Sequence, residues 1–239
     1  TRAAQEHVAL STADQVVAAL SGEPVANALN APSVDESAYP RIRPYVDLAE
    51  TAGRIAAGLF DGRPAEITVR YEGEVADEDV ELVTAGALKG AFSPLEWQVN
   101  AVNAARIAEE RGVEVTEERT RRATDFRSLV TVTVGDGEDA IPVCGTLFAD
   151  DDPRIVRIDG YRLDAVPYGQ MLVARNYDTP GVIGFVGTVL GDADVNIAGM
   201  FNARETIGGE ALTVYNLDDP VPDETVATLA DDERIIEVR

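Results

Sequence analysis

Residues 175–200, RNYDTPGVIGFVGTVLGDADVNIAGM, have the types and spacing that best suit ligand binding in this sequence. Asp178 ends a β-rich run, the proline two residues on suits a first helical turn, and Asp178 or Thr179 can cap that helix. Gly181 and Gly184 let a ligand or a neighbouring backbone come close. The segment therefore predicts a strand, a tight turn and a helix.

This turn offers partners for both ends of a free amino acid. The N–H groups of Gly181, Val182 and Ile183, at a helix N-terminus, suit a carboxylate. The Asp178 carboxylate suits an ammonium, and Asn196, on the next strand, can present its amide to the same cleft. An alternative stays open: Asp178 only caps the helix, the glycines only pack, and Asn196 only turns the chain. Spacing alone does not choose between the two interpretations.

The sequence predicts no catalytic residue and no metal site. His7 is the only histidine, and its helical surroundings favour a surface or domain-contact role. Carboxylates are so abundant that no pair, such as Glu109 and Glu110, stands out as an acid and a base. Neither phosphate-binding glycine pattern, G-x-x-x-x-G-K or G-x-G-x-x-G, is present. Cys144, the only cysteine, lies in the apolar run 141–148 and is expected to be a buried filler.

The charge balance excludes nucleic acid as a partner and indicates a salty environment. The chain has 43 acidic and 20 basic residues, a net charge of −23, and Lys89 is its only lysine. Such a chain repels itself unless salt screens it. We therefore expect a protein of a salt-loving, haloarchaeal organism. No stretch has the apolar length of a membrane span, and no signal sequence is evident, so a soluble cytoplasmic protein is expected.

The hydrophobic pattern predicts an α+β protein. Helices are expected over residues 2–20, 45–60, 77–91 and 95–111, and the proline-rich stretch 23–44 is expected to be an extended connector. Strands are expected around 67–71, 113–115, 129–134, 141–148 and 155–163, with a turn at Gly160. Residues 169–239 read as strand, helix, strand, strand, helix, strand. That order predicts a four-stranded antiparallel sheet with two helices on one face.

The order of these motifs resembles a known family. The strand, D-x-P-G-V-I-G, helix and V-N-I-A-G-M order of residues 169–239 resembles an ACT domain, a ferredoxin-like module that binds amino acids. Residues 4–32 resemble the end of the catalytic region of D-3-phosphoglycerate dehydrogenases. The segments LVTAGALKGAFSP and NAVNAARIAEERGVEV resemble the intervening domain of their long form. The resemblance implies three parts: 1–32 closing the catalytic region, 33–168 as an intervening α/β domain with an antiparallel sheet, and 169–239 as the ACT domain.

The sequence also departs from this family. The catalytic His, the Rossmann glycine fingerprint and the active-site Arg and Glu of the family have no counterparts here, and the chain does not begin with Met. We therefore expect the C-terminal part of a longer dehydrogenase, inactive by itself, with no cofactor of its own and with NAD bound by the parent enzyme.

The resemblance places serine sensing at Asn176, Asp178 and Asn196, with the backbone of residues 181–183 at the ligand's carboxylate. Some relatives have His or Tyr at the position of Asn176, and Asn at that of Asp178. The intervening domain of some relatives also binds anions, and phosphate-bearing effectors call for Arg or Lys. The candidates for such a site are Lys89, Arg154, Arg157 and Arg162, with solvated charges or intramolecular ion pairs as the alternative.

Three functions fit these features. The leading hypothesis is the regulatory portion of an NAD-dependent phosphoglycerate dehydrogenase, in which L-serine or a related amino acid binds between subunits of a homodimer or homotetramer. The second is an oligomerisation module that senses nothing, since a small sheet has edge strands free for pairing. The third is a free-standing amino-acid sensor that acts on another protein.

Overall fold

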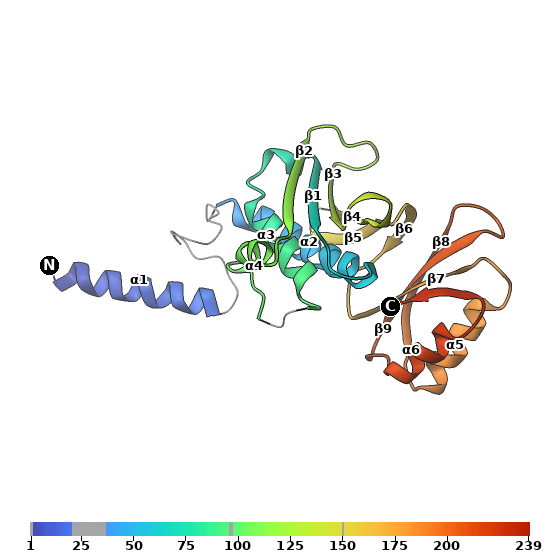
Figure 1. The fold of residues 1–239 in the computed structure, drawn as a ribbon. Coiled ribbons are helices and arrows are strands. Elements are labelled where there is room, and N and C mark those ends of the chain that lie inside the picture. Colours follow the sequence, from blue (N-terminus) through green and yellow to red (C-terminus); the bar gives the residue numbers. More distant parts are fainter. Residues whose placement is uncertain (1, 21–36, 96–97, 150) are drawn as a thin grey trace.

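The computed structural model describes residues 2–20, 37–95, 98–149 and 151–239. Helix α1 (Arg2–Leu20) lies apart from the rest of the described chain, and the helix predicted over residues 2–20 is confirmed (Figure 1). The connector predicted over 23–44 lies mostly outside the described residues, and from Tyr39 onward it is helical. None of the helices in these ranges has the length and apolar character needed to cross a bilayer.

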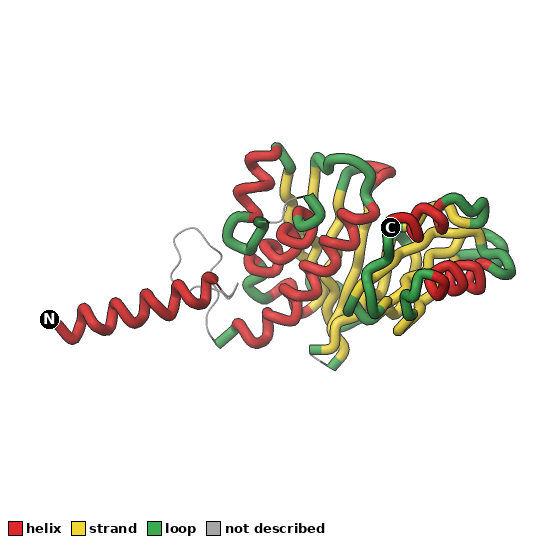
Figure 2. Tube along the Cα trace, turned by 90° about the horizontal axis from the view of Figure 1, so that it is seen from below, coloured by secondary structure: helices red, strands yellow, loops and turns green. Residues whose placement is uncertain are grey.

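The middle unit, residues 37–165, is one sheet covered on one face by helices (Figure 2). The strand order is β2-β1-β3-β4-β5-β6, and only the β1–β2 pair is parallel, so the expected antiparallel sheet is mixed at one edge. The strands are β1 (Glu66–Gly73), β2 (Glu114–Thr120), β3 (Ser128–Val134), β4 (Ile141–Phe148), β5 (Asp152–Ile158) and β6 (Tyr161–Ala165). The alternation of Ile67, Val69 and Tyr71 in β1 places all three side chains, fully buried, in the core.

The covering helices are α2 (Tyr39–Leu59), α3 (Glu81–Phe92) and α4 (Ala104–Arg111), and two 3₁₀ turns, Glu74–Asp77 and Gly137–Asp139, complete the unit. The helix predicted over 77–91 is divided between the first 3₁₀ turn and α3. Of the helix predicted over 95–111, the described residues 98–103 are not helical, and α4 begins at Ala104. There the Asn100 side chain accepts the backbone N–H groups of Val102 and Asn103, and the Asn103 side chain accepts that of Asn100. Asparagine side chains that bond their own backbone favour turns over helix.

The C-terminal unit, residues 170–239, confirms the predicted element order and ferredoxin-like arrangement (Figure 1). Its antiparallel sheet has the order β10-β7-β9-β8, and both helices pack on one face. The elements are β7 (Gln170–Tyr177), α5 (Val182–Asp192), β8 (Ile197–Arg204), β9 (Glu210–Leu217), α6 (Asp223–Ala230) and β10 (Ile235–Val238).

The other face of this sheet packs against the middle unit. Val173, Leu212 and Val214 belong to the same hydrophobic core as the residues under α2. Polar contacts reinforce the junction: Arg175 pairs with Asp159, and the Asn216 amide donates to the backbone oxygens of Val166 and Tyr168. The two units are therefore joined by one continuous core.

Candidate functional site

Asp178 lies directly after β7 and is held by the β8–β9 hairpin. Its Oδ2 accepts the backbone N–H of Gly208 at 3.0 Å and pairs with the Arg204 guanidinium at 2.6 Å. These two contacts, the Gly208 hydrogen bond above all, lower the pKa of Asp178 below its usual value. Asp178 is thus a charged carboxylate with a cation beside it at neutral pH.

The expected capping of α5 by Asp178 or Thr179 is wrong. Gly181 is the N-cap residue, with φ of +94°, and no side chain caps the helix. This left-handed conformation strongly favours glycine and turns the chain into the helix without a side-chain acceptor. The first N–H groups of the helix have no intrahelical acceptor, so the turn keeps the anion-binding character that its sequence suggested.

Arg234 is a second cation at this helix end. Its Nη1 lies 3.6 Å from the position that a Cβ on Gly181 would take, and its guanidinium lies over the Phe185 ring at 4.6 Å. Asp232 fixes it through two hydrogen bonds of 2.7 Å, which lower the pKa of Asp232 to about 2. No local pattern in the sequence pointed to Arg234 or Arg204, because both reach this turn from segments distant in the chain: Arg234 from the turn before β10, and Arg204 from the end of β8.

Asn176 lies beneath the turn rather than at its surface. It is 5% exposed, its amide donates to the Tyr177 carbonyl at 2.9 Å, and its Oδ1 accepts from the Thr213 hydroxyl at 3.4 Å. Asn202 of the edge strand β8 donates to the same hydroxyl at 2.7 Å. This polar chain crosses three strands, so Asn176 supports the turn and its amide is already engaged.

Asn196 does not share a cleft with Asp178 within one copy of the chain. Leu217, at one end of β9, pairs with both Gln170 and Ile197, which places Asn196 at that end of the sheet. Asp178 lies beyond the opposite end, past the pairing of Tyr177 with Glu210. Seven residues of strand separate these ends by roughly 23 Å. The Asn196 amide instead donates to Asp218 at 2.7 Å.

The four candidates for an anion site do not form one cluster. Lys89, on α3, pairs with Glu50 of α2 at 2.8 Å, within the helix layer. Ile155 and Ile158 of β5 face that layer, whereas Val156 and Cys144 form a separate cluster on the other face.

The arginine candidates lie on that other face of the sheet. Arg157 pairs in register with Cys144, Arg162 pairs with Arg157, and both guanidinium groups approach Asp125, at 3.8 and 3.7 Å. Arg154 is held by Asp152 and Asp164 and lies over the Phe148 ring. The structure therefore separates Lys89 from the three arginine candidates. Lys89 and Arg154 have acidic partners of their own, whereas Arg157 and Arg162 share Asp125.

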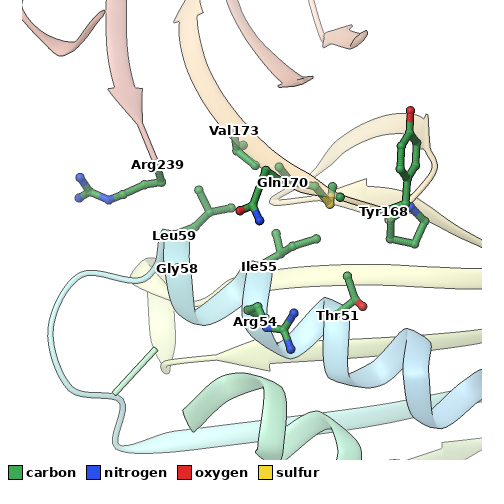
Figure 3. Close-up of a pocket in the computed structure, with 12 residues that line it drawn as sticks. Thr51, Arg54, Ile55, Gly58, Leu59, Tyr168, Gln170, Val173 and Arg239 are labelled. Carbon is green, nitrogen blue, oxygen red and sulfur yellow. The ribbon is translucent and has the colours of Figure 1, made fainter. Parts of the chain in front are cut away.

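A cleft of about 390 Å³ opens between α2 and the start of β7 (Figure 3). Ile55 and Leu59 of α2 and Val173 of β7 give the cleft an apolar lining, and the Gln170 amide lies between Ile55 and Leu59 in this view. Arg54 at its side is engaged by Glu50 at 2.8 Å and by Ser93. None of the residues predicted from the sequence lines this cleft, so it is separate from the candidate effector turn.

Cys144 is a buried filler, as predicted. It is 4% exposed, and burial raises the pKa of its thiol. Within the described ranges, no group of histidine, cysteine, aspartate and glutamate side chains is arranged to hold a metal ion.

We expect Cys144 to react with an aromatic disulfide reagent at least about 100-fold more slowly in the native chain than in denaturant. The thiolate is the reactive form, and burial beside Val156 disfavours it. Absorbance of the released thiolate would follow the reaction. A native rate close to the denatured rate would contradict the burial.

Comparison with known proteins agrees with this architecture. Residues 41–159, most of the middle unit, match the family described as "D-3-phosphoglycerate dehydrogenase intervening domain". Beyond that domain, the similarity extends to the whole chain. D-3-phosphoglycerate dehydrogenase of Archaeoglobus fulgidus is 35% identical over 99% of this chain, that of Bacillus subtilis 31% over 100%, and that of Synechocystis 34% over 93%. The chain is thus homologous to the D-3-phosphoglycerate dehydrogenases, and it covers 45%, 46% and 41% of these relatives.

Proposed function

We propose that this chain is the regulatory portion of an NAD-dependent D-3-phosphoglycerate dehydrogenase, which oxidises 3-phosphoglycerate to 3-phosphohydroxypyruvate in the first step of L-serine synthesis. In this proposal the C-terminal unit is an ACT domain that senses L-serine between two copies of the chain, and the enzyme works in the cytoplasm of a salt-loving organism. NAD does not fit this chain, because the sequence has no glycine-rich turn to hold its pyrophosphate. The chemistry is therefore assigned to other parts of the parent enzyme.

The position of the polar groups carries the proposal. Asp178 and Asn196 lie at opposite ends of one sheet, so a single copy offers an amino acid only half of a site. If the β8 strand of a second copy pairs antiparallel with β8 of the first, Asn196 of the second copy comes beside Asp178 of the first. A two-fold contact of this kind creates two identical complete sites.

Exposed apolar side chains support such a contact. Met200 in the middle of β8 is 39% exposed, and Ile183 at the start of α5 is 50% exposed. Within the described residues no strand pairs with the outer edge of β8. An edge strand of this kind is a ready template for pairing with another chain.

In the assembled site, Asp178 would hold the ligand's ammonium, and the backbone of residues 181–183 its carboxylate. The partner's Asn196 would bond the remaining polar groups of the ligand. Serine would inhibit the parent enzyme by favouring one arrangement of subunits, and effector coupling typically changes affinity by about 5- to 150-fold.

A second candidate function is supported by a specific observation. Asp178 and Asn196 already have partners within the chain, Arg204 and Asp218, so neither is left unsatisfied without a ligand. An oligomerisation module that senses nothing would show the same contacts.

We expect Asp178→Ala to weaken L-serine binding about tenfold or more, because it removes a charge-assisted hydrogen bond to the ammonium. Calorimetric titration of the whole chain in molar salt measures this, with glycine and 3-phosphoglycerate as comparison ligands. Asp77→Ala, which removes an exposed aspartate of the middle unit, is the matched control. Equal serine affinity in the wild type and in Asp178→Ala, or no binding to either, would favour the oligomerisation module.

A further inference from the structure

The edge strand β8 has opposite charges at its two ends. Arg204 is its last residue, and its side chain is 47% exposed. Asp218, also exposed, lies at the other end, where its carboxylate accepts from Asn196 and its backbone N–H bonds the Asn196 carbonyl at 3.1 Å. Each charged residue thus covers one of the two polar groups assigned to the effector.

A two-fold contact along β8 would bring these charges together. When two copies of β8 run antiparallel about the middle of the strand, the start of β8 in each copy, next to Asn196, lies beside the end of β8 in the other, at Arg204; the bulge between Ile197 and Gly199 shifts the register by one residue. Asp218 stands beside residue 196, so Arg204 of one copy meets Asp218 of the second. Because the contact is symmetric, the same pair forms twice. In a chain with a net charge of −23, such attractive pairs oppose the general repulsion between copies.

We propose that Arg204 and Asp218 form ion pairs between two copies of the chain, and that each gives up its own-chain partner, Asp178 or Asn196, to do so. For each new ion pair, the exchange gives up one exposed ion pair, Arg204–Asp178, and one exposed hydrogen bond, Asn196–Asp218, so its cost is small and it is reversible. The exchange releases Asp178 from Arg204 and Asn196 from Asp218, so that both can bind the amino acid. This last step rests on the proposed function.

If the effects of substituting Arg204 and Asp218 on self-association are not additive, the interaction between the two residues must arise between copies of the chain. In one chain Arg204 pairs with Ala211 and Asp218 follows Leu217, which places them at opposite ends of β9, about 20 Å apart. Residues that far apart, with no shared partner, are expected to behave additively within one chain.

Charge reversal tests the proposal. In a mixture of Arg204→Glu and Asp218→Arg chains, a mixed dimer has Glu opposite Arg at one contact and Arg opposite Asp at the other. Each variant alone would face two like-charged contacts. We expect each variant alone to self-associate at least fivefold more weakly than the wild type, and the mixture to regain the loss. A tagged chain of one variant, used to capture the untagged other, measures the preference, and analytical ultracentrifugation gives the affinities.

Matched variants separate these contacts from net charge and from misfolding. Arg63→Glu and Asp136→Arg make the same charge changes at exposed positions of the middle unit and should show no preference for mixed dimers. Arg204→Gln and Asp218→Asn, which keep polar side chains of similar size, should weaken self-association without rescue on mixing. Self-association of the single variants at the wild-type level, or a mixture no tighter than its components, would overturn the proposal.

Titrating the same samples with L-serine distinguishes the ion-pair exchange from serine sensing. A preference for mixed dimers supports the ion-pair exchange whether or not serine binds. Serine binding by the wild type without that preference overturns the exchange and leaves the sensing proposal standing. The preference without serine binding supports the exchange and counts against sensing.

Discussion

Replacing Gly90 with valine is expected to lower the free energy of unfolding by about 3 kcal/mol or more, because the added side chain has no room. Gly90 lies where α3 crosses α2, and a Cβ on it would overlap the backbone carbonyl of Glu50. Backbone cannot rotate out of the way as a side chain can, so the two helices must separate. Urea unfolding followed by circular dichroism measures the loss.

Gly58→Ala is the control for this prediction. Gly58 lies in α2, the helix that α3 crosses, but nothing lies within 4 Å of the position of its Cβ. Alanine there should leave stability unchanged or raise it by up to about 1 kcal/mol, since it lowers the entropy of the unfolded chain and favours helix. Similar losses of unfolding free energy in Gly90→Val and Gly58→Ala would contradict the prediction, because they would show that the close contact of α2 with α3 does not depend on Gly90.

The fold was more predictable from the sequence than the site, because each element is a local pattern. Alternating residues such as Ile67, Val69 and Tyr71 define a strand without knowledge of its neighbours. The error over residues 98–103 has a local cause too: asparagine side chains there bond the backbone N–H groups that a helix would use. Asn100 and Asn103 are the two residues from which turns, rather than a helix, could have been predicted here.

The site depends on the order of the strands in the sheet, which no local pattern in the sequence shows. In the β7-β9-β8 order, β7 and β8 run in the same direction. Asp178 follows the end of β7 and Asn196 precedes the start of β8, so the two residues lie at opposite ends of the sheet although only 18 positions separate them in the sequence. The same order brings Arg204 to Asp178. The division of Lys89 from the arginines of β5 and β6 likewise depends on which face of the sheet the helices cover.

Val214→Asp is expected to have the largest effect of all, a loss of about 4 kcal/mol or more, because it buries a charge without a partner. Val214 is fully buried, in the middle of β9, on the face that packs against the middle unit. Its register neighbours, Val173 and Phe201, offer no polar group. In calorimetric unfolding we expect the single transition of the two units to split, with the C-terminal unit melting first.

Ile207→Asp provides the matched control, since Ile207 lies in the adjacent β8–β9 turn and is 87% exposed. Its effect should stay within about 0.5 kcal/mol. A single unsplit transition in Val214→Asp would mean that the shared core does not hold the two units together. This matters for regulation, because an effector between two C-terminal units can act on distant parts of an enzyme only if each unit moves with the domain beside it. The apolar face of β7 and β9 provides that connection, and in the proposed function the edge strand β8, on the same sheet, would receive the signal.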